Sequence, residues 1–157
     1  MSDESATCNF ILFLFSVILL KRGVTMEMDT NNRSVFSLHY HLVLVVKYRK
    51  KVINNEVSAA IREIFSNIAP NYHIEVEEWN HDTDHVHVLF KANPKTDLVK
   101  FLNSFKSASS RIVKKEYPQI KEKLWKESFW TKSYCLITTG GASIETIRKY
   151  IEKQGGN

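Results

Sequence analysis

Apolar and polar side chains alternate along residues 36–46, and this period of two predicts a β-strand. The second face of the segment also becomes apolar towards its end, which is typical of a central strand. Residues 72–79 and 85–91 alternate in the same way on either side of a polar turn, and therefore predict a hairpin. A fourth strand is expected at about residues 134–139, after a stretch rich in aromatic and basic side chains.

Apolar residues three or four positions apart predict helices between these strands. The first helix covers about residues 57–68 and ends before Pro70, and the second begins near Asp97. A final helix, which Ser143 can cap, is expected to run to about Gln154. The order β-α-β-β-α-β predicts an α+β, ferredoxin-like (split βαβ) fold: a four-stranded antiparallel sheet with two helices on one face, plus the C-terminal helix. The other face of the sheet would be open to a ligand.

Residues 1–25 do not resemble the rest of the chain. Their apolar run, residues 9–20, is twelve residues long, which is too short to cross a bilayer comfortably, and no small-residue cleavage site follows it. Because Met26 and Met28 come just before the regular pattern, we expect a mis-assigned start or a disordered extension over 1–25, and one domain over 26–157. A membrane anchor is the alternative.

The formal net charge is +5, and the first 25 residues contribute none of it. A basic domain favours an anionic partner such as nucleic acid, although many basic proteins bind none. The two cysteines, Cys8 and Cys135, have neither zinc-ligand spacing nor a disulfide framework. A reducing, cytoplasmic setting therefore fits best, and no membrane partner is expected.

The first candidate for chemistry is the pair His85 and His87, one residue apart on the third predicted strand. Strand side chains alternate faces, so both imidazoles lie on the face opposite the apolar side. A metal or substrate could reach them on that face. Asp84 could orient one imidazole as a hydrogen-bond acceptor. Two ordinary histidines on a half-exposed strand are the alternative, since His39 and His41 have the same spacing on the first strand. These two could line the same site, and we interpret them as structural or close to DNA.

The second candidate is the pair Tyr150 and Gln154, which are four residues apart and therefore share one side of the final predicted helix. Gly140 and Gly141 precede this helix and permit backbone angles closed to other residues, so they could form a hinge. An ordinary docking helix after a tight turn is the alternative. A phenol has a pKa of about 10, so a nucleophilic tyrosine needs a metal or a base beside it.

Three segments carry a resemblance to a known family, and they occur in the family's order. They are VFSLHYHLVLVVKYR at residues 35–49, DHVHVL at 84–89 and FWTKSYCLITTGGASIETIRKYIEKQ at 129–154. Together they resemble the single-tyrosine HUH-class transposases of single-strand insertion sequences, a superfamily that includes the REP-associated tyrosine transposases. The likeness covers roughly residues 26–154, so the N-terminal extension lies outside it.

The resemblance implies a metal-assisted reaction on single-stranded DNA. His85, His87 and Gln154 would bind a divalent ion, Mg²⁺ or Mn²⁺, through nitrogen and oxygen ligands. Tyr150 would attack a DNA phosphate and leave a 5′-phosphotyrosine and a free 3′-hydroxyl. A different 3′-hydroxyl could then reverse the step and exchange strands without ATP.

The resemblance also implies a homodimer in which the tyrosine helix of one subunit completes the histidine site of the other, with Gly140 and Gly141 as the hinge. Hairpins at the insertion-sequence ends would be recognised by basic side chains. The expected phosphate contacts are Lys47, Arg49, Lys106 and Arg111.

Two other interpretations stay open. A domesticated repeat-associated nuclease of the HUH class would share these motifs. A ferredoxin-like module that binds nucleic acid without cutting it is the second, although the third strand lacks the aromatic, glycine-rich pattern of an RRM. Replication initiators and relaxases usually carry further domains, for which 157 residues leave no room.

Overall fold

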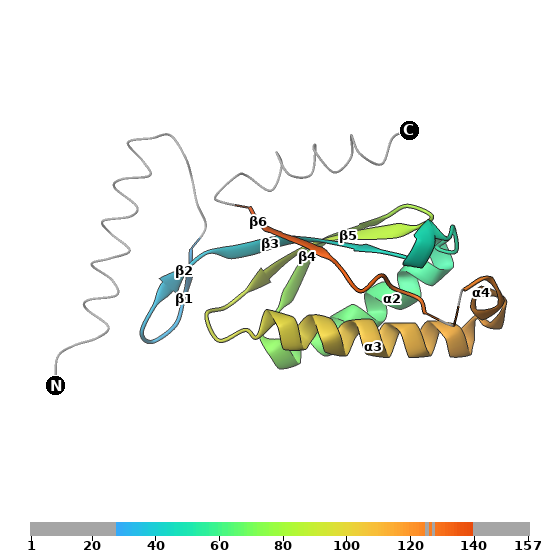
Figure 1. Cartoon of the computed structure of the whole chain (residues 1–157). Coiled ribbons are helices and arrows are strands. Elements are labelled where there is room, and N and C mark those ends of the chain that lie inside the picture. Colours follow the sequence, from blue (N-terminus) through green and yellow to red (C-terminus); the bar gives the residue numbers. More distant parts are fainter. Residues whose placement is uncertain (1–27, 125, 127, 140–157) are drawn as a thin grey trace.

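The structure, a computed structural model, describes residues 28–124, 126 and 128–139 of the 157-residue chain. Its main elements follow the order that the hydrophobic pattern predicts (Figure 1). They are β3 (Leu38–Val45), α2 (Asn55–Ile68), β4 (Glu75–His81), β5 (His85–Ala92), α3 (Leu98–Glu116) and β6 (Cys135–Thr138). The shorter elements are β1 (Asp29–Thr30), β2 (Val35–Phe36), the 3₁₀ turns η1 (Lys47–Arg49) and η2 (Ala69–Tyr72), and α4 (Pro118–Lys123).

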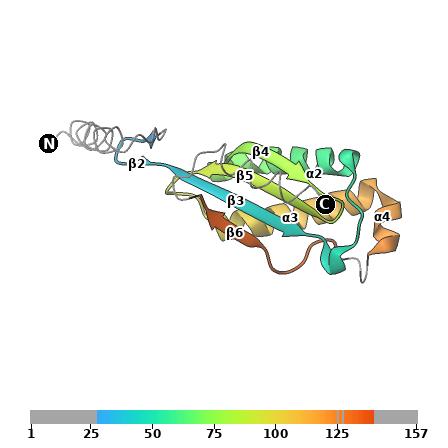
Figure 2. The same cartoon turned by 90° about the horizontal axis from the view of Figure 1, so that it is seen from above.

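Four strands form one antiparallel sheet in the order β4-β5-β3-β6 (Figure 2). β5 lies between β3 and β4, which α2 joins along the chain, and this is the split βαβ arrangement. The predicted α+β, ferredoxin-like fold is therefore confirmed. The expected C-terminal helix and the extension over residues 1–25 lie outside the described residues. Within the described ranges, no helix has the length and apolar character needed to span a membrane.

Helices α2 and α3 cover one face of the sheet (Figures 1 and 2). Each begins after a capping side chain, Asn54 for α2 and Asp97 for α3, which accepts a hydrogen bond from the backbone amide three residues on. Aromatic rings fill the space between the helices and the sheet. The ring centroid of Phe65 on α2 is 4.9 Å from those of Phe101 and Phe105 on α3, and all three side chains are fully buried.

Local backbone conformation explains where the elements differ from the prediction. His73 has a left-handed backbone with a φ of 57°, so the chain turns there and β4 begins at Glu75 instead of Tyr72. A β-bulge between Val76 and Glu78 then shifts the register of β4 against β5. The β1–β2 hairpin and α4 are absent from the prediction, because elements this short carry too little hydrophobic periodicity.

The face of the sheet away from the helices carries the histidines. The residues that alternate with the core positions of β3 and β5 lie there, among them His41, His87 and Leu89. This face is not uniformly open, because these three residues are 8%, 8% and 1% exposed, whereas Ile137 on β6 is 54% exposed. The histidines at the centre of the sheet are thus buried polar groups that need partners.

Candidate active site

His87 lies on β5 opposite Val43 of β3. Its Nδ1 atom is 3.0 Å from Nε2 of His41, and the two rings meet edge to edge, with centroids 5.2 Å apart and planes inclined at 19°. His41 is opposite Leu89 in the register, so it reaches His87 diagonally across the two strands. The strand register is therefore what joins the two histidines.

The surroundings of both imidazoles favour their neutral form. Burial lowers the pKa of His87 to about 4, and the nearby His85 and His41 act in the same direction. Burial also lowers the pKa of His41. Nε2 of His87 is buried and has no hydrogen-bond partner among the residues that the structure describes. A neutral imidazole with Nδ1 engaged and Nε2 unpartnered has the form in which histidine binds metals.

A carboxylate holds His85. Its Nδ1 atom is 2.6 Å from Oδ1 of Asp84, whose Oδ2 accepts a 2.7 Å hydrogen bond from Nε of Arg49. Burial alone would raise the pKa of Asp84, but the hydrogen bonds with Arg49 and His85 outweigh it and hold that pKa below its usual value. The contact expected between Asp84 and a neighbouring imidazole is thus present in the structure.

The backbone after β3 brings Arg49 to this carboxylate. Tyr48 and Arg49 both have left-handed backbone conformations, with φ angles of 59° and 52°. Non-glycine residues in this region carry strain of order 1–3 kcal/mol each, so the surrounding contacts must hold them there. The amide of Val46, just before η1, donates to the carbonyl of Asp84 at 2.8 Å. The side chain of Arg49 stays 73% exposed, so its outer nitrogens can meet a second anion.

A divalent ion fits the two motif histidines, although they cannot hold it alone. Because Nδ1 of both His85 and His87 is engaged, Nε2 of each ring is the atom suited to a metal, and the orphaned Nε2 of His87 supports this. The described residues contain no group of three or more histidine, cysteine or acidic side chains arranged to hold an ion. The remaining predicted site residues lie outside the described part of the chain: Gln154, Tyr150, Gly140 and Gly141.

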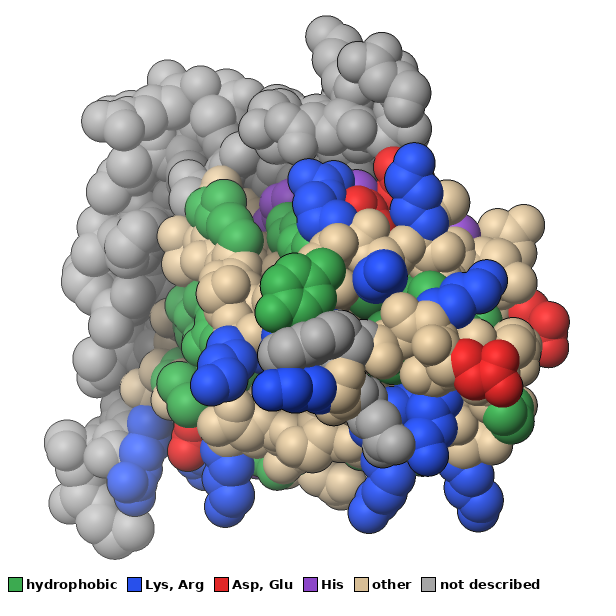
Figure 3. All heavy atoms as spheres, turned by 45° about the vertical axis from the view of Figure 1, so that its right-hand side comes forward, with side chains coloured by type: hydrophobic (Ala, Val, Ile, Leu, Met, Phe, Trp, Pro, Cys, Tyr) green, Lys and Arg blue, Asp and Glu red, His purple; other side chains and the backbone are tan. Residues whose placement is uncertain are grey.

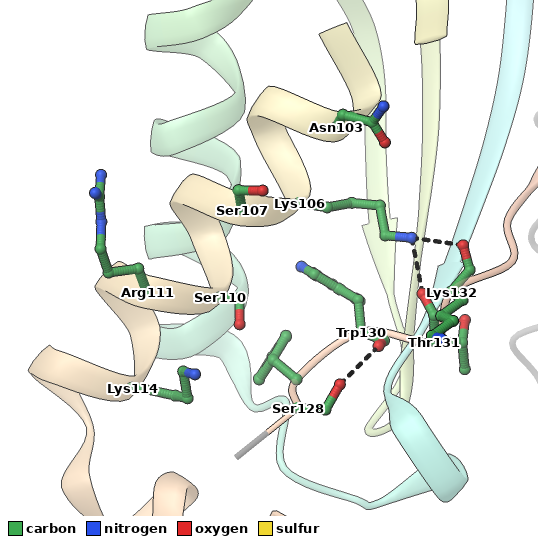
Figure 4. Close-up of a pocket in the computed structure, with 11 residues that line it drawn as sticks. Asn103, Lys106, Ser107, Ser110, Arg111, Lys114, Ser128, Trp130, Thr131 and Lys132 are labelled. Carbon is green, nitrogen blue, oxygen red and sulfur yellow. Dashed lines mark hydrogen bonds between the residues drawn. The ribbon is translucent and has the colours of Figure 1, made fainter. Parts of the chain in front are cut away.

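The basic residues predicted to bind phosphate occupy two separate places. Lys47 and Arg49 lie in η1, at the end of β3 next to the histidine site. Lys106 and Arg111 lie on α3 and line a groove of about 350 Å³ between α3 and the segment 128–132, which we call the α3 groove (Figure 4). The structure therefore brings one pair to the histidines and places the other pair on the helical side of the sheet.

Among the residues that the structure describes, the lining of the α3 groove contains four basic and four hydroxyl side chains and no acidic one. Lys106 points across the groove and donates to the carbonyls of Thr131 and Lys132 at 2.7 and 2.9 Å, while burial lowers its pKa. Arg111 extends away from that segment (Figure 4). Figure 3 shows lysine and arginine side chains along the lower edge of the molecule, and others beside the histidine side chains near the top of the same view. The groove thus offers positive charge and hydroxyl groups to an anion.

Sequence reasoning could not separate the two histidines of the first strand, and the structure does. Nδ1 of His39 is 2.8 Å from Oε2 of Glu77 on β4, so this histidine has a carboxylate as its partner. His41 instead contacts His87. In the sequence, the equal spacing of the two histidine pairs suggested that the first pair could line the site. Only the register of β3 against β5 shows which histidine of that pair contacts the His85–His87 motif.

The comparison with protein families gives a match to the IS200-like transposases over residues 34–154. The chain is similar to the ISDra2 transposase TnpA of Deinococcus radiodurans, with 39% identity over 129 residues that cover 82% of this chain and 92% of that protein. It is also similar to the transposase for insertion sequence element IS200 of Salmonella typhimurium, with 27% identity over 115 residues, or 73% of this chain and 75% of that one.

Solved structures give the same result. A Deinococcus radiodurans R1 protein described as a transposase, solved at 1.90 Å, matches with a TM-score of 0.66 and 31% identity, covering 83% of this chain and all of that one. A REP-associated tyrosine transposase bound to a REP hairpin matches with a TM-score of 0.55 over 80% of this chain and 69% of that one, and at 10% identity this likeness is one of fold. The chain belongs to the IS200-like transposase family, and is an enzyme of DNA transposition.

Proposed function

We propose that this transposase cleaves and rejoins single-stranded DNA at insertion-sequence ends, through a 5′-phosphotyrosine intermediate and with a divalent metal ion. The observation that carries the proposal is the state of the motif histidines. Nδ1 of each is engaged by a neighbour, and Nε2 of His87 is buried without a partner among the described residues. Imidazoles fixed in this way are prepared to bind an ion.

His85, His87 and Gln154 would hold the ion, Mg²⁺ or Mn²⁺, which would polarise a phosphoryl oxygen and offset the charge that develops there. The phenolic oxygen of Tyr150 forms a bond to phosphorus while the bond from phosphorus to the 3′-oxygen breaks. One strand then ends in a free 3′-hydroxyl, and the other is joined to Tyr150 through its 5′-phosphate. Attack by a different 3′-hydroxyl on this link releases Tyr150 and joins new strands.

The polar groups around the histidines would orient the site and its substrate. Asp84 fixes the ring of His85, and Arg49 in turn fixes Asp84. The outer guanidinium nitrogens of Arg49 remain available for a DNA phosphate, because the side chain is mostly exposed. Lys47 lies two residues before Arg49 in the same 3₁₀ turn and adds a second cation at the edge of the site.

The α3 groove would bind the backbone of a hairpin stem through Lys106 and Arg111. An ammonium group has three donors, and Lys106 uses two of them on backbone carbonyls, which leaves one for a phosphate oxygen. The four basic side chains in the described lining of the groove favour a polyanion there. The hairpin bound to a REP-associated tyrosine transposase of the same fold supports a hairpin as the ligand.

We also propose a homodimer in which the tyrosine helix of one subunit completes the histidine site of the other, with Gly140 and Gly141 as its hinge. This part rests on the family resemblance, since those residues lie outside the described ranges. The domain over residues 26–157 would carry the whole activity.

A labelled hairpin oligonucleotide tests the proposal. The single strand carries one label on each side of the expected nick and is mixed with the full chain, with and without Mn²⁺. We expect a covalent protein–DNA adduct only with Mn²⁺, and its loss in Tyr150→Phe. Tyr117→Phe, which removes the hydroxyl of the tyrosine at the end of α3, is the matched control and should form the adduct normally.

The other outcomes contradict the proposal in different ways. Hairpin binding without an adduct in the wild-type chain would favour a non-catalytic binding module. An adduct that survives Tyr150→Phe would move the nucleophile to another residue. An adduct that forms equally well in EDTA would remove the metal from the mechanism.

A further inference from the structure

The hydrogen bond between His41 and His87 joins two nitrogens, and only one of them can carry the proton. Nδ1 of His87 and Nε2 of His41 are 3.0 Å apart, and both residues are 8% exposed. Two neutral imidazoles can share such a bond in either direction. In one, His87 donates through Nδ1–H, and in the other, His41 donates through Nε2–H.

The second ring nitrogen of His87, Nε2, distinguishes the two directions of this hydrogen bond. If His41 donated, His87 would carry its proton on Nε2, which would then be a buried donor without a partner among the described residues. An unsatisfied buried N–H group is costly. If His87 donates instead, Nε2 keeps its lone pair, which is the form that binds a metal.

We propose that His41 is a positioning residue: it accepts the Nδ1 proton of His87 and thereby fixes both the ring and the tautomer in which Nε2 of His87 faces the metal site. The inference rests on the proposed function, because it takes His87 as a metal ligand. It extends that function to a residue on a different strand, outside the histidine motif.

The sheet explains how His41 can do this. His41 lies on the central strand β3, paired on one side with β5 and on the other with β6, so its backbone is held by two ladders. Its ring is nearly coplanar with that of His87, at an angle of 19°, as expected for two imidazoles joined edge to edge by a hydrogen bond. Because the N–H group lies in the plane of its ring, this hydrogen bond restrains both the plane and the rotation of the His87 ring. His85 receives the corresponding support from the carboxylate of Asp84.

Two substitutions separate hydrogen bonding from packing. His41→Phe keeps a flat ring against His87 but cannot accept a proton, whereas His41→Gln keeps an acceptor. His39→Phe is the matched control, because His39 lies on the same strand and face but pairs with Glu77. Two measurements on the full-length chain apply: nitrogen NMR of the histidine rings in metal-free protein, and Mn²⁺ binding by electron paramagnetic resonance. Thermal unfolding confirms that each variant is folded.

We expect metal-free wild-type protein to show His87 protonated on Nδ1, and His41→Phe to show a mixture of tautomers. The Mn²⁺ dissociation constant should rise about 10–100-fold in His41→Phe, in line with the loss of other groups that orient metal ligands. His41→Gln should recover most of this loss, and His39→Phe should bind Mn²⁺ like the wild type.

Several results would overturn the proposal. These are protonation of His87 on Nε2 in the wild type, unchanged Mn²⁺ binding in His41→Phe, or equal losses in the Phe and Gln variants. If His41→Phe does not fold, the tautomer of His87 in the wild type and the Mn²⁺ affinity of His41→Gln still test the proposal. His87→Ala is measured alongside: if it binds Mn²⁺ as tightly as the wild type, the metal site itself is wrong, whereas an unchanged His41→Phe alone refutes only the role of His41.

Discussion

The histidine site and the α3 groove lie on different sides of one sheet and are built from different contacts. In the site, His41, His87 and Asp84 are no more than 8% exposed, and each side chain has a partner at 3.0 Å or less. In the groove, Arg111 and Lys132 are exposed and face an open hollow. We therefore expect the chemistry of the histidine site to depend on the positions of its imidazole rings, and the binding of DNA in the groove to depend on positive charge. Because of this difference, we expect mutations in the histidine site to change cleavage and mutations in the α3 groove to change DNA affinity.

The largest effect is expected from His87→Ala. Loss of this proposed metal ligand should lower adduct formation by more than roughly 100-fold, beyond the effect of removing a supporting residue. Hairpin binding measured by gel shift should stay near wild type, because the groove is untouched. His73→Asn is the control, since asparagine tolerates the left-handed backbone at this exposed histidine. Equal loss of binding and cleavage would show that the two regions are not separable.

Asp84→Asn should have the next largest effect. The amide keeps the shape of the side chain but loses the charge that holds His85 and Arg49, so we expect Mn²⁺ affinity to fall about 10–100-fold. Titration calorimetry of the full chain measures this. Unchanged affinity would mean that His85 does not need the carboxylate.

Asp84→Asn should also change how the stability of the folded protein depends on pH. The folded state lowers the pKa of Asp84, so its ionised form stabilises the fold above the ordinary pKa of 3.8, and this contribution is lost as the pH falls through the lowered value. At neutral pH, Asp84→Asn should lower the free energy of unfolding by about 1–3 kcal/mol, nearer the lower figure because Arg49 is mostly exposed. Urea denaturation at pH 7 and at pH 2–3 should show the gap between wild type and variant narrowing in acid. A gap independent of pH would contradict the prediction.

Substitutions in the α3 groove should act on affinity alone. Lys106→Ala and Arg111→Ala should each weaken hairpin binding several-fold and reduce the slope of log affinity against log salt by about one per lost phosphate contact. Adduct formation at saturating DNA should be unchanged. Lys115→Ala, an exposed lysine of α3 outside the groove, is the control. An unchanged salt slope in both groove variants would show that DNA does not lie in the groove.

The smallest effect is expected from deletion of residues 1–25. The family match begins at residue 34, and this segment carries no net charge, so both regions should keep their properties. Adduct yield and hairpin affinity of the shortened chain should equal those of the full chain. A shortened protein that loses activity or changes its location in the cell would revive the alternative of a membrane anchor.

The fold was largely predictable from the sequence, because strand and helix periods differ and the core positions follow them. Val86, Val88 and Phe90 alternate with the motif histidines along the predicted third strand and form its apolar side, and all three are fully buried. Turns defined by single backbone conformations were not predictable. Nothing in the sequence marks His73 as left-handed, or places Tyr48 and Arg49 in that region together.

The candidate site was predictable only in part. The motif indicated His85 and His87. It also suggested Asp84, because this residue directly precedes His85 and its side chain can therefore reach that imidazole. The contact between His41 and His87 depends on how β3 aligns with β5, which is a property of the whole sheet. The same holds for Lys106 and Arg111: the sequence shows their charge, but the position of α3 decides that they lie away from the histidines.

The end of β3 has a further consequence. Three backbone hydrogen bonds meet there: the amide of Val46 bonds to Asp84, that of Lys47 to Phe129, and that of Thr131 to Val45. They tie the turn before the histidine motif and the wall of the α3 groove to one short stretch of chain. If the groove binds a hairpin stem as proposed, this junction would hold the stem at a fixed distance from the histidine site.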